Sequence, residues 1–403
     1  MEIEHYLTYQ HNVQKYFRRH ADKYSGIVVP MSIAVSFPGG TYGFVRALCA
    51  KDRKKRYAVD PRTPLFQKAW DRSQVRKPHE KMAAALGEPF RNKGIAGTLE
   101  PSDFDGDALT EAVEQCLAYQ KQFRARKEDA RKLAKYKKLL GLSQLGELQE
   151  PQFLIPPYFQ FQSASDPWFE VSARAVETAG QFADGIPVRP VIHMRNWDAV
   201  GDWGQLLERF GRAKCSEALL YPNNFKEHEA SLADLRQYRS TVEQFAESGV
   251  RPFALFGGYF SILLSAFGLR GFANGVGYGE WRDSGYHRGG TAALRVYVPR
   301  LHRYLDVPAA QNILDGDAEY FAAGPDLLSE CTDGNRPLSD LSQEECLDHL
   351  MESRNDEISL LVKRGLRAAR EELQETLERL DAIGPLEREK YGDSLERWLS
   401  ATE

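Results

Sequence analysis

The chain of 403 residues has little cysteine and no long apolar run. Its five cysteines, an odd number at irregular spacing, argue against a disulfide framework and fit a reducing compartment. The longest apolar stretches are much shorter than the roughly 18 residues of a membrane-spanning helix, so no membrane partner is expected. The first ten residues, MEIEHYLTYQ, are polar and acidic and predict no export signal. We therefore expect a cytoplasmic protein.

Neither sign of charge dominates, and several common catalytic motifs are absent. The net charge of −4 argues against a wholly basic nucleic-acid binder, although charge can be concentrated locally. No GxGxxG or GxxxxGKS/T sequence follows the first expected strand, which weakens the nucleotide-binding folds that use these loops. No GxSxG occurs, and no cysteine stands in a recognisable catalytic context.

A metal site is not expected. Cys331, Cys346 and His349 lie near one another in the sequence, and the last two have the i, i+3 spacing that can put two ligands on one helix face. A structural zinc normally needs four ligands, however, and no CxxC or CxC is present. We interpret these residues as packing cysteines and a surface histidine, and expect no cofactor.

The most informative segment runs from Arg251 to Glu280 and reads RPFALFGGYFSILLSAFGLRGFANGVGYGE. A short apolar run ends at a Gly-Gly pair, an apolar segment of helical length follows, and a second short run ends in another glycine cluster. This order predicts a βαβ unit, whose parallel strands put both glycine turns at the same end of a sheet. That end is where α/β folds place their sites.

Apolar runs and helical patterns alternate along the rest of the chain, which is typical of a parallel sheet covered by helices. Further strands are expected at 27–35, 56–59, 153–161, 188–194 and 217–221, and helices at 168–182, 198–212 and 232–247. The seven or eight strands favour a TIM-like (β/α)8 barrel over an open doubly wound sheet. Residues 294–298 are interpreted as one more strand or an extended connection.

We expect two parts. The barrel would occupy residues 1–305 and would include one long inserted basic helix at 107–140. Residues 306–403 would form a C-terminal helical extension, which packs on the barrel, on a second copy of the chain or on another protein.

The inserted helix carries a local excess of positive charge. Residues 121–138, KQFRARKEDARKLAKYKK, hold nine Lys and Arg against two acids. Such helices attract phosphate backbones through counterion release, although a solvated helix is the alternative interpretation. The candidate nucleic-acid contacts are Arg124, Arg126, Lys127, Arg131, Lys132, Lys135, Lys137 and Lys138.

Polar side chains follow the ends of the expected strands, where barrel sites are built. Asp60 and Glu280 are the candidate catalytic carboxylates, for acid–base or nucleophilic chemistry. His193 and Arg195 would bind polar or phosphate groups. The remaining candidates for substrate binding are Tyr221, Asn223, Gly257, Gly258, Tyr259, Asn274 and Tyr278. Each of these residues could instead cap a helix, form a tight turn or solvate a loop.

Over roughly residues 25–350, the pattern resembles the tRNA-guanine transglycosylase superfamily. These enzymes are (β/α)8 barrels that exchange a guanine for a deazaguanine base in nucleic acid. The turn at Gly257-Gly258, the short helix and the strand to Gly275 match the last barrel strand of the family. Cys331 and His349-Leu350 fall near its zinc ligands, whereas Thr332 to Asn335 stand where two further cysteines would be.

The resemblance implies a barrel fold and a connection with nucleic acid, but the family's nucleophile is missing. Asn274 stands where the family has its nucleophilic aspartate, and Glu280 is the nearby carboxylate. An amide cannot form the covalent ribosyl ester that an aspartate forms. The family's Gly-Gly-Phe-Gln signature is also absent, with Asp60-Pro61-Arg62-Thr63-Pro64 in its region.

Three functions stay open. The first is a nucleic-acid-directed enzyme for base exchange or glycosidic-bond chemistry, encoded in a DNA-modification or antiphage-defence operon. The second is a catalytically inactive barrel that serves as a nucleic-acid-binding or assembly subunit. The third is a small-molecule metabolic barrel enzyme, which would have no affinity for nucleic acid.

Overall fold

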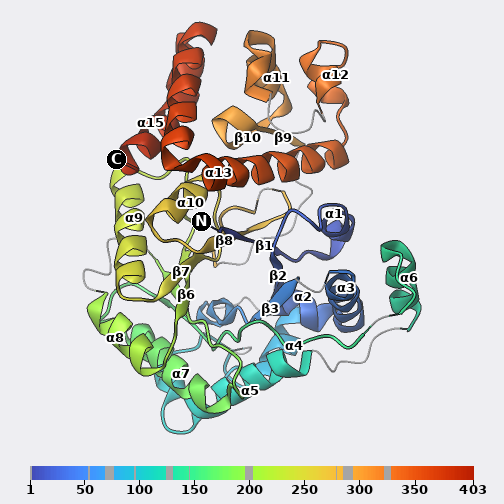
Figure 1. Cartoon of the computed structure of the whole chain (residues 1–403). Coiled ribbons are helices and arrows are strands. Elements are labelled where there is room, and N and C mark those ends of the chain that lie inside the picture. Colours follow the sequence, from blue (N-terminus) through green and yellow to red (C-terminus); the bar gives the residue numbers. More distant parts are fainter. Residues whose placement is uncertain are drawn as a thin grey trace.

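A computed structural model describes residues 2–52, 55–68, 77–94, 97–123, 130–144, 146–195, 203–277, 279–284, 294–321 and 328–403. Within these residues, eight parallel strands form one curled sheet in the order β3-β2-β1-β8-β7-β6-β5-β4 (Figure 1). Their bounds are β1 Glu4–Thr8, β2 Gly26–Pro30, β3 Arg56–Asp60, β4 Gln160–Phe161, β5 Val191–Met194, β6 Glu217–Pro222, β7 Arg251–Ala254 and β8 Gly271–Gly275.

Helices connect the successive strands, so the expected α/β class is confirmed. They are α1 Gln14–Arg19, α2 Met31–Ser36, α3 Pro38–Lys51, α4 Lys77–Leu86, α5 Ala108–Gln122, α6 Ala130–Leu140, α7 Pro167–Phe182, α8 Gly204–Arg212, α9 Leu232–Glu247 and α10 Tyr259–Leu264. The βαβ unit expected from Arg251 onward is present as β7, α10 and β8.

The first strand of the chain pairs with the last strand of the eight-stranded sheet. Strand β1 lies between β2 and β8, so that Tyr6 is opposite Gly26 on one side and Ala273 on the other. A Cβ atom at Gly26 would lie 2.7 Å from the ring of Tyr6, which explains the glycine at this position. The strand was missed in the sequence because Glu4–Thr8, EHYLT, is too polar and short to stand out.

Strands β3 and β4 form the two edges of the sheet, and hydrogen bonds link the segments beside them. The amide of Gln152 donates to the carbonyl of Tyr57 over 2.9 Å. The amide of Tyr158 donates to the hydroxyl of Thr63 over 2.9 Å. These contacts link the segment before β4 to β3 and to the turn after it, without a ladder between β3 and β4 in the described residues.

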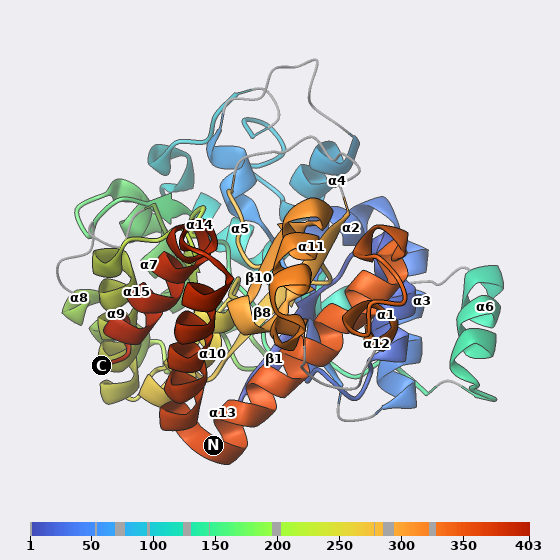
Figure 2. The same ribbon diagram turned by 90° about the horizontal axis from the view of Figure 1, so that it is seen from above.

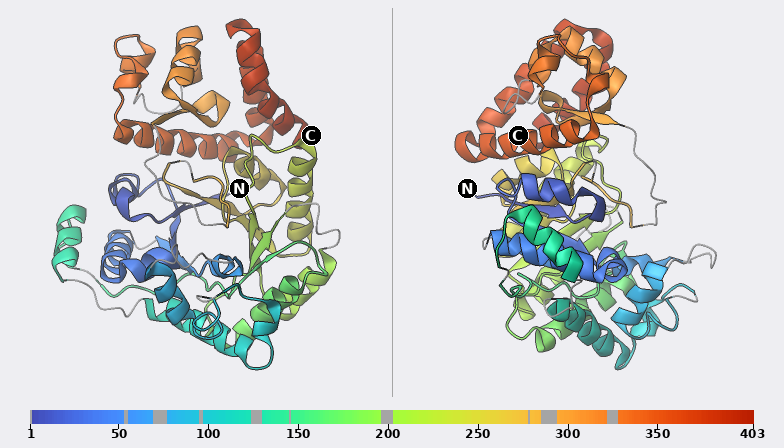
Figure 3. Two further views of the ribbon diagram at one scale, coloured as in Figure 1. Left: turned by 180° about the vertical axis from the view of Figure 1, so that it is seen from behind. Right: turned by 90° about the vertical axis from the view of Figure 1, so that its right-hand side faces the viewer.

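The residues after β8 form a cap on one end of the molecule (Figures 1 and 3). It contains a two-stranded antiparallel sheet and further helices: β9 Arg295–Val298, β10 Arg303–Asp306, α11 Val307–Gly316, α12 Ser329–Thr332, α13 Gln343–Ile383, α14 Pro385–Glu387 and α15 Asp393–Ala401. Helix α13 crosses the molecule when it is seen from above (Figure 2). It bends at Gly365, whose φ of 78° and ψ of 177° are not helical.

The cap and the sheet share one hydrophobic core. Tyr259 and Phe260 of α10 belong to the same buried cluster as Leu373 of α13 and Trp398 of α15. The indole of Trp398 also donates to the carbonyl of Glu227 over 3.1 Å. The C-terminal extension therefore packs on the sheet domain, as one of the sequence interpretations proposed.

Two sequence predictions of elements are wrong. The apolar run 27–35 is not one strand, because β2 ends at Pro30 and α2 begins at Met31. Both halves are largely buried, and apolar periodicity alone does not separate a buried strand from a buried helix. In place of one helix over 107–140, the structure has α5, which packs on α7, and α6, which packs on α3.

Among the described residues, no helix combines the length and the apolar character needed to cross a membrane.

Candidate functional site

A cavity lies at the carboxyl end of the sheet, beside the ends of β3 and β6. It encloses about 260 Å³ of empty space, including the solvent at its opening. Its lining consists of Asp60, Arg62, Pro64, Leu65, Tyr158, Tyr221, Phe256, Arg282 and Ser284. We call it the carboxyl-end cavity. It combines one carboxylate, two guanidinium groups and three aromatic rings.

Asp60 and Arg62 form a buried ion pair at the end of β3. Asp60 is 1% exposed and Arg62 is 7% exposed. The Asp60 carboxylate accepts hydrogen bonds from the Tyr158 hydroxyl at 2.8 Å, the Arg62 amide at 3.0 Å and the Arg62 Nε at 3.3 Å. Asp60 is therefore held in one orientation by three donors.

The Arg62 side chain is not fully satisfied by this pairing. Its Nη2 atom is buried and has no hydrogen-bond partner in the part of the chain that the structure describes. Its backbone has a φ of 51°, in the left-handed region that residues other than glycine seldom adopt. Buried donors normally have partners, and strained residues cluster at ligand sites. Both features favour Arg62 as an anion-binding residue.

Arg282 brings a second positive charge to the same cavity. Burial, together with the nearby charge of Arg62, lowers the pKa of Arg282 to about 10. Two guanidinium groups near each other are unfavourable unless an anion offsets their charge, and the Asp60 carboxylate does so in part. Guanidinium groups bind phosphate and carboxylate through paired hydrogen bonds, so this cavity is suited to such a group.

Aromatic side chains form the opposite wall. The Tyr221 ring lies 4.9 Å from that of Phe256, and the His193 ring stacks on Tyr221 at 4.1 Å with an interplanar angle of 9°. His193 is fully buried, and burial lowers its pKa to about 3, so it is a neutral imidazole. A planar ring could pack against these side chains.

Asn223 supports the loop that carries Arg282. Its side-chain oxygen accepts a hydrogen bond from the amide of Ser284 at 2.7 Å and lies 3.4 Å from His193 Nε2. The next residue, Asn224, donates its amide to the carbonyl of Arg282 over 2.8 Å. Asn223 therefore positions the cavity wall and is not one of its lining residues.

Glu280 is not in the carboxyl-end cavity. It is buried and accepts a hydrogen bond from Arg354 of α13, which also forms an ion pair with Glu357 at 2.7 Å. Burial raises the pKa of Glu280 to about 8; Arg354 opposes this shift, whereas Glu227 and Glu357 add to it. Glu280 thus connects the end of β8 with the cap, only two residues before Arg282.

The Gly257-Gly258 turn holds a carboxylate of the chain itself. Glu227 accepts hydrogen bonds from the amide of Gly258 at 2.9 Å, the amide of Phe260 at 2.8 Å and the Ser261 hydroxyl at 2.6 Å. A Cβ at Gly258 would lie 2.8 Å from Glu227. The backbone at Gly257-Gly258, a candidate for substrate binding, is therefore occupied by Glu227, at the start of α10.

The remaining candidates are dispersed. Asn274 lies in β8, where its side-chain oxygen is 2.9 Å from His5 Nε2. Tyr259 is buried beneath the cap and stacks on His302. Arg195 is exposed after β5, and its amide donates to the carbonyl of Phe161 over 3.1 Å. Tyr278 lies outside the described residues.

The expected basic surface is described in part. Arg124, Arg126 and Lys127 lie outside the described residues. On α6, Arg131, Lys132, Lys135 and Lys138 are exposed, whereas Lys137 is half-buried. Helix α6 lies at the periphery of the molecule, against α3 (Figure 2).

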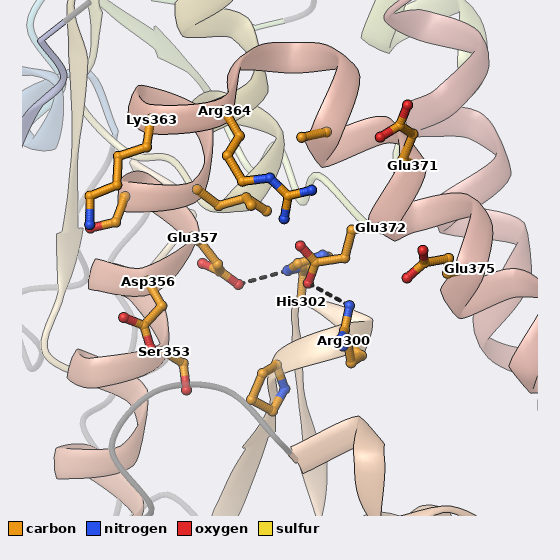
Figure 4. Close-up of a pocket in the computed structure, with 14 residues that line it drawn as sticks. Arg300, His302, Ser353, Asp356, Glu357, Lys363, Arg364, Glu371, Glu372 and Glu375 are labelled. Carbon is orange, nitrogen blue, oxygen red and sulfur yellow. Dashed lines mark hydrogen bonds and ion pairs between the residues drawn. The ribbon is translucent and has the colours of Figure 1, made fainter.

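A second, wider cavity lies at the bend of α13 and encloses about 1230 Å³, including the solvent at its opening (Figure 4). Arg300 pairs with Glu372 at 3.0 Å, and His302 Nδ1 lies 2.7 Å from Glu357. Lys363 before the bend and Glu371 after it also line the cavity. Since charges of both signs surround it, its lining does not favour a ligand of one charge.

Asp60 and Tyr221 were candidates from the sequence, and the other seven lining residues of the carboxyl-end cavity were missed. Among the missed residues are Arg62, Tyr158, Phe256 and Arg282. Arg62 and Arg282 each stand two residues beyond a candidate carboxylate, and this proximity was the available signal. The left-handed backbone of Arg62 has no signature in the sequence.

A comparison with models of protein families and a search of curated proteins found no match to this chain.

Proposed function

We propose that the protein is a nucleic-acid-directed enzyme with a closed TIM-like (β/α)8 barrel, and that its carboxyl-end cavity acts on a glycosidic bond. The reaction would be base exchange or base removal, as the resemblance to tRNA-guanine transglycosylases implies. The barrel is supported by the pairing of β1 with β8 and by the hydrogen bonds that link the segment before β4 to β3 and to the turn after it.

One observation carries the proposal: an oriented carboxylate, two guanidinium groups and aromatic rings share one small cavity at the carboxyl end of the sheet. Arg62 and Arg282 would hold a phosphate, and Tyr221 or Phe256 would pack against a base. Because the cavity is small, the nucleotide would bind across its opening.

Asp60 would supply the catalytic carboxylate. Its oxygen would form a bond to the sugar C1′ as the bond from C1′ to the base breaks, and the departing base would take a proton from water. An incoming base or a water would then displace the carboxylate from C1′ and release a proton to the solvent. No other described residue that lines the cavity has a carboxylate, which is why Asp60 is preferred here to Glu280.

Asp60→Asn tests this role. Oligonucleotides of DNA and RNA are incubated with the protein, and released bases and the incorporation of labelled guanine are measured by mass spectrometry. We expect the variant to lose at least about a thousandfold in rate, as other enzymes do when a nucleophile is removed. Glu217→Gln is the matched control, because Glu217 is also buried and ion-paired but lies at the amino end of β6.

Full activity in Asp60→Asn, or activity lost in Glu280→Gln alone, would contradict the assignment of Asp60.

The second candidate is an inactive barrel that binds nucleic acid or assembles with other proteins. It is favoured by Asn274, which stands at the family's nucleophile position and is engaged by His5. This function predicts binding of oligonucleotides with no release or exchange of bases under any condition of the same assay.

A further inference from the structure

An exposed aromatic pair lies between α2 and α3. Phe37 is 47% exposed. Two other large hydrophobic residues of the described chain are exposed, Val362 and Leu386, and both are aliphatic. The ring of His11 stacks on Phe37 at 4.7 Å with an interplanar angle of 9°. A large exposed aromatic residue with one face already stacked is suited to stack on a further ring.

Two lysines of α6 lie beside this pair. Tyr136 packs α6 against Gly43 of α3, where a Cβ would lie 3.4 Å from its ring. One turn earlier, the Lys132 side chain passes 3.6 Å from the Cβ position of Gly40. The His11 ring lies 3.7 Å from the same Cβ position, and Lys135 follows Lys132 by one turn of α6. Burial lowers the pKa of His11, and the charges of Lys132 and Lys135 add to this shift.

The pair lies at the same end of the sheet as the carboxyl-end cavity. Helix α3 connects the parallel strands β2 and β3, so it begins near their carboxyl ends, directly after Phe37. Gln14 fixes α6 at this end by donating hydrogen bonds to Tyr9 at 2.6 Å and to Tyr136 at 3.3 Å. Tyr9 directly follows β1.

We propose that Phe37, His11, Lys132 and Lys135 form a docking surface for single-stranded nucleic acid. An unpaired base stacks on Phe37, and the two lysines contact adjacent phosphates. Duplex bases are stacked on each other and cannot use Phe37, so the surface selects single strands. This inference rests on the proposed function, to which it adds the form of the substrate.

The test is the binding of a fluorescent 15-nucleotide strand to the full chain, measured by anisotropy at several salt concentrations with DNA and RNA of one sequence. We expect Phe37→Ala to weaken binding about 5- to 100-fold and Phe37→Trp to retain it. We expect Lys132→Gln with Lys135→Gln to reduce the slope of log affinity against log salt by about 1.4, since each phosphate contact contributes about 0.7 for single strands.

Matched controls leave the surface intact. Leu386→Ala removes an exposed apolar side chain elsewhere, and Lys51→Gln with Lys214→Gln removes two exposed charges at the amino end of the sheet. Both should bind as the wild type does. Equal preference for DNA and RNA assigns recognition to base and phosphate, and a preference for RNA adds a contact to the 2′-hydroxyl.

Unchanged affinity in Phe37→Ala, or tighter binding of duplex than of single strands, would overturn the docking surface. A different result would contradict the proposed function alone. In that case the wild type would release or exchange no bases but would still bind single strands through Phe37 and the two lysines.

Discussion

Two arginine residues at the carboxyl-end cavity lower the stability of the folded chain. The backbone of Arg62 is in the left-handed region, and its buried Nη2 has no hydrogen-bond partner among the described residues. The guanidinium group of Arg282 lies near that of Arg62, so that the two positive charges repel each other. Strained residues and unpaired buried donors each cost roughly 1–3 kcal/mol. Such features persist where function requires them, which is the reason to place the site here and not at the wider cavity of α13.

A single buried carboxyl group should make the stability depend on pH. Glu280 has a pKa of about 8 in the folded chain, against an ordinary value of 4.5, mainly because it is buried. The folded chain therefore holds a proton that the unfolded chain has lost between these values. Its contribution to stability is complete below pH 4.5 and is lost as the pH rises through 8.

Glu280→Gln removes this titration. We expect the free energy of unfolding of the wild type to fall relative to that of the variant between pH 5 and pH 8, by at most about 1.4 kcal/mol per pH unit. Urea unfolding of both proteins at several pH values measures the difference. Parallel pH profiles for the two proteins would show that Glu280 does not hold a proton in the folded chain.

At the scale of elements, the bend of α13 depends on one glycine. Gly365 has a φ of 78° and a ψ of 177°, and no atom lies within 4 Å of its Cβ position. Gly365→Ala would therefore not clash, but its backbone strain should lower the free energy of unfolding by about 1–3 kcal/mol. Thermal or urea unfolding measures this change.

Gly180→Ala is the matched control for the bend. Gly180 lies inside the regular helix α7 and also has no atom within 4 Å of its Cβ position. Alanine should stabilise this helix by about 0.4–1 kcal/mol. If Gly365→Ala raised the free energy of unfolding as much as Gly180→Ala does, the bend at Gly365 would not be required.

Some of these elements were predicted from the sequence, and others were missed. Glycine turns and apolar runs predicted β7, α10 and β8, because each strand there is short, buried and bounded by glycine. The bend at Gly365 was missed because an isolated glycine is compatible with a helix. The split at Pro30 was missed because the strand and helix on its two sides are both apolar.

The candidate site was predicted in part for a related reason. Asp60 and Tyr221 end buried strands, so the topology of a parallel sheet brings them to the same end. Arg62 and Arg282 lie in turns, and turn conformation decides the direction of their side chains. Glu280 also follows a strand, but its pairing with Arg354 depends on a helix more than 70 residues later in the chain.

At the scale of the whole molecule, the sheet domain and the cap should unfold together. Trp398 is 1% exposed, its ring lies 5.6 Å from that of Tyr259, and both belong to the shared core. We expect Trp398→Ala to lower the free energy of unfolding by about 3–5 kcal/mol in a single transition. Circular dichroism and tryptophan fluorescence during urea unfolding should give the same midpoint.

Leu386→Ala is the control for the cap, because Leu386 is 73% exposed and its loss should cost less than about 0.5 kcal/mol. Two separate transitions, of which Trp398→Ala shifts only one, would mean that the cap folds independently of the sheet.

The most direct test of the central claim is a crystal structure of the protein with a nucleoside 5′-monophosphate at saturating concentration. The account predicts phosphate oxygens within hydrogen-bonding distance of Arg62 and Arg282, with the base against Tyr221 or Phe256 and the sugar beside Asp60. An empty carboxyl-end cavity, with the nucleotide bound elsewhere or not at all, would contradict it.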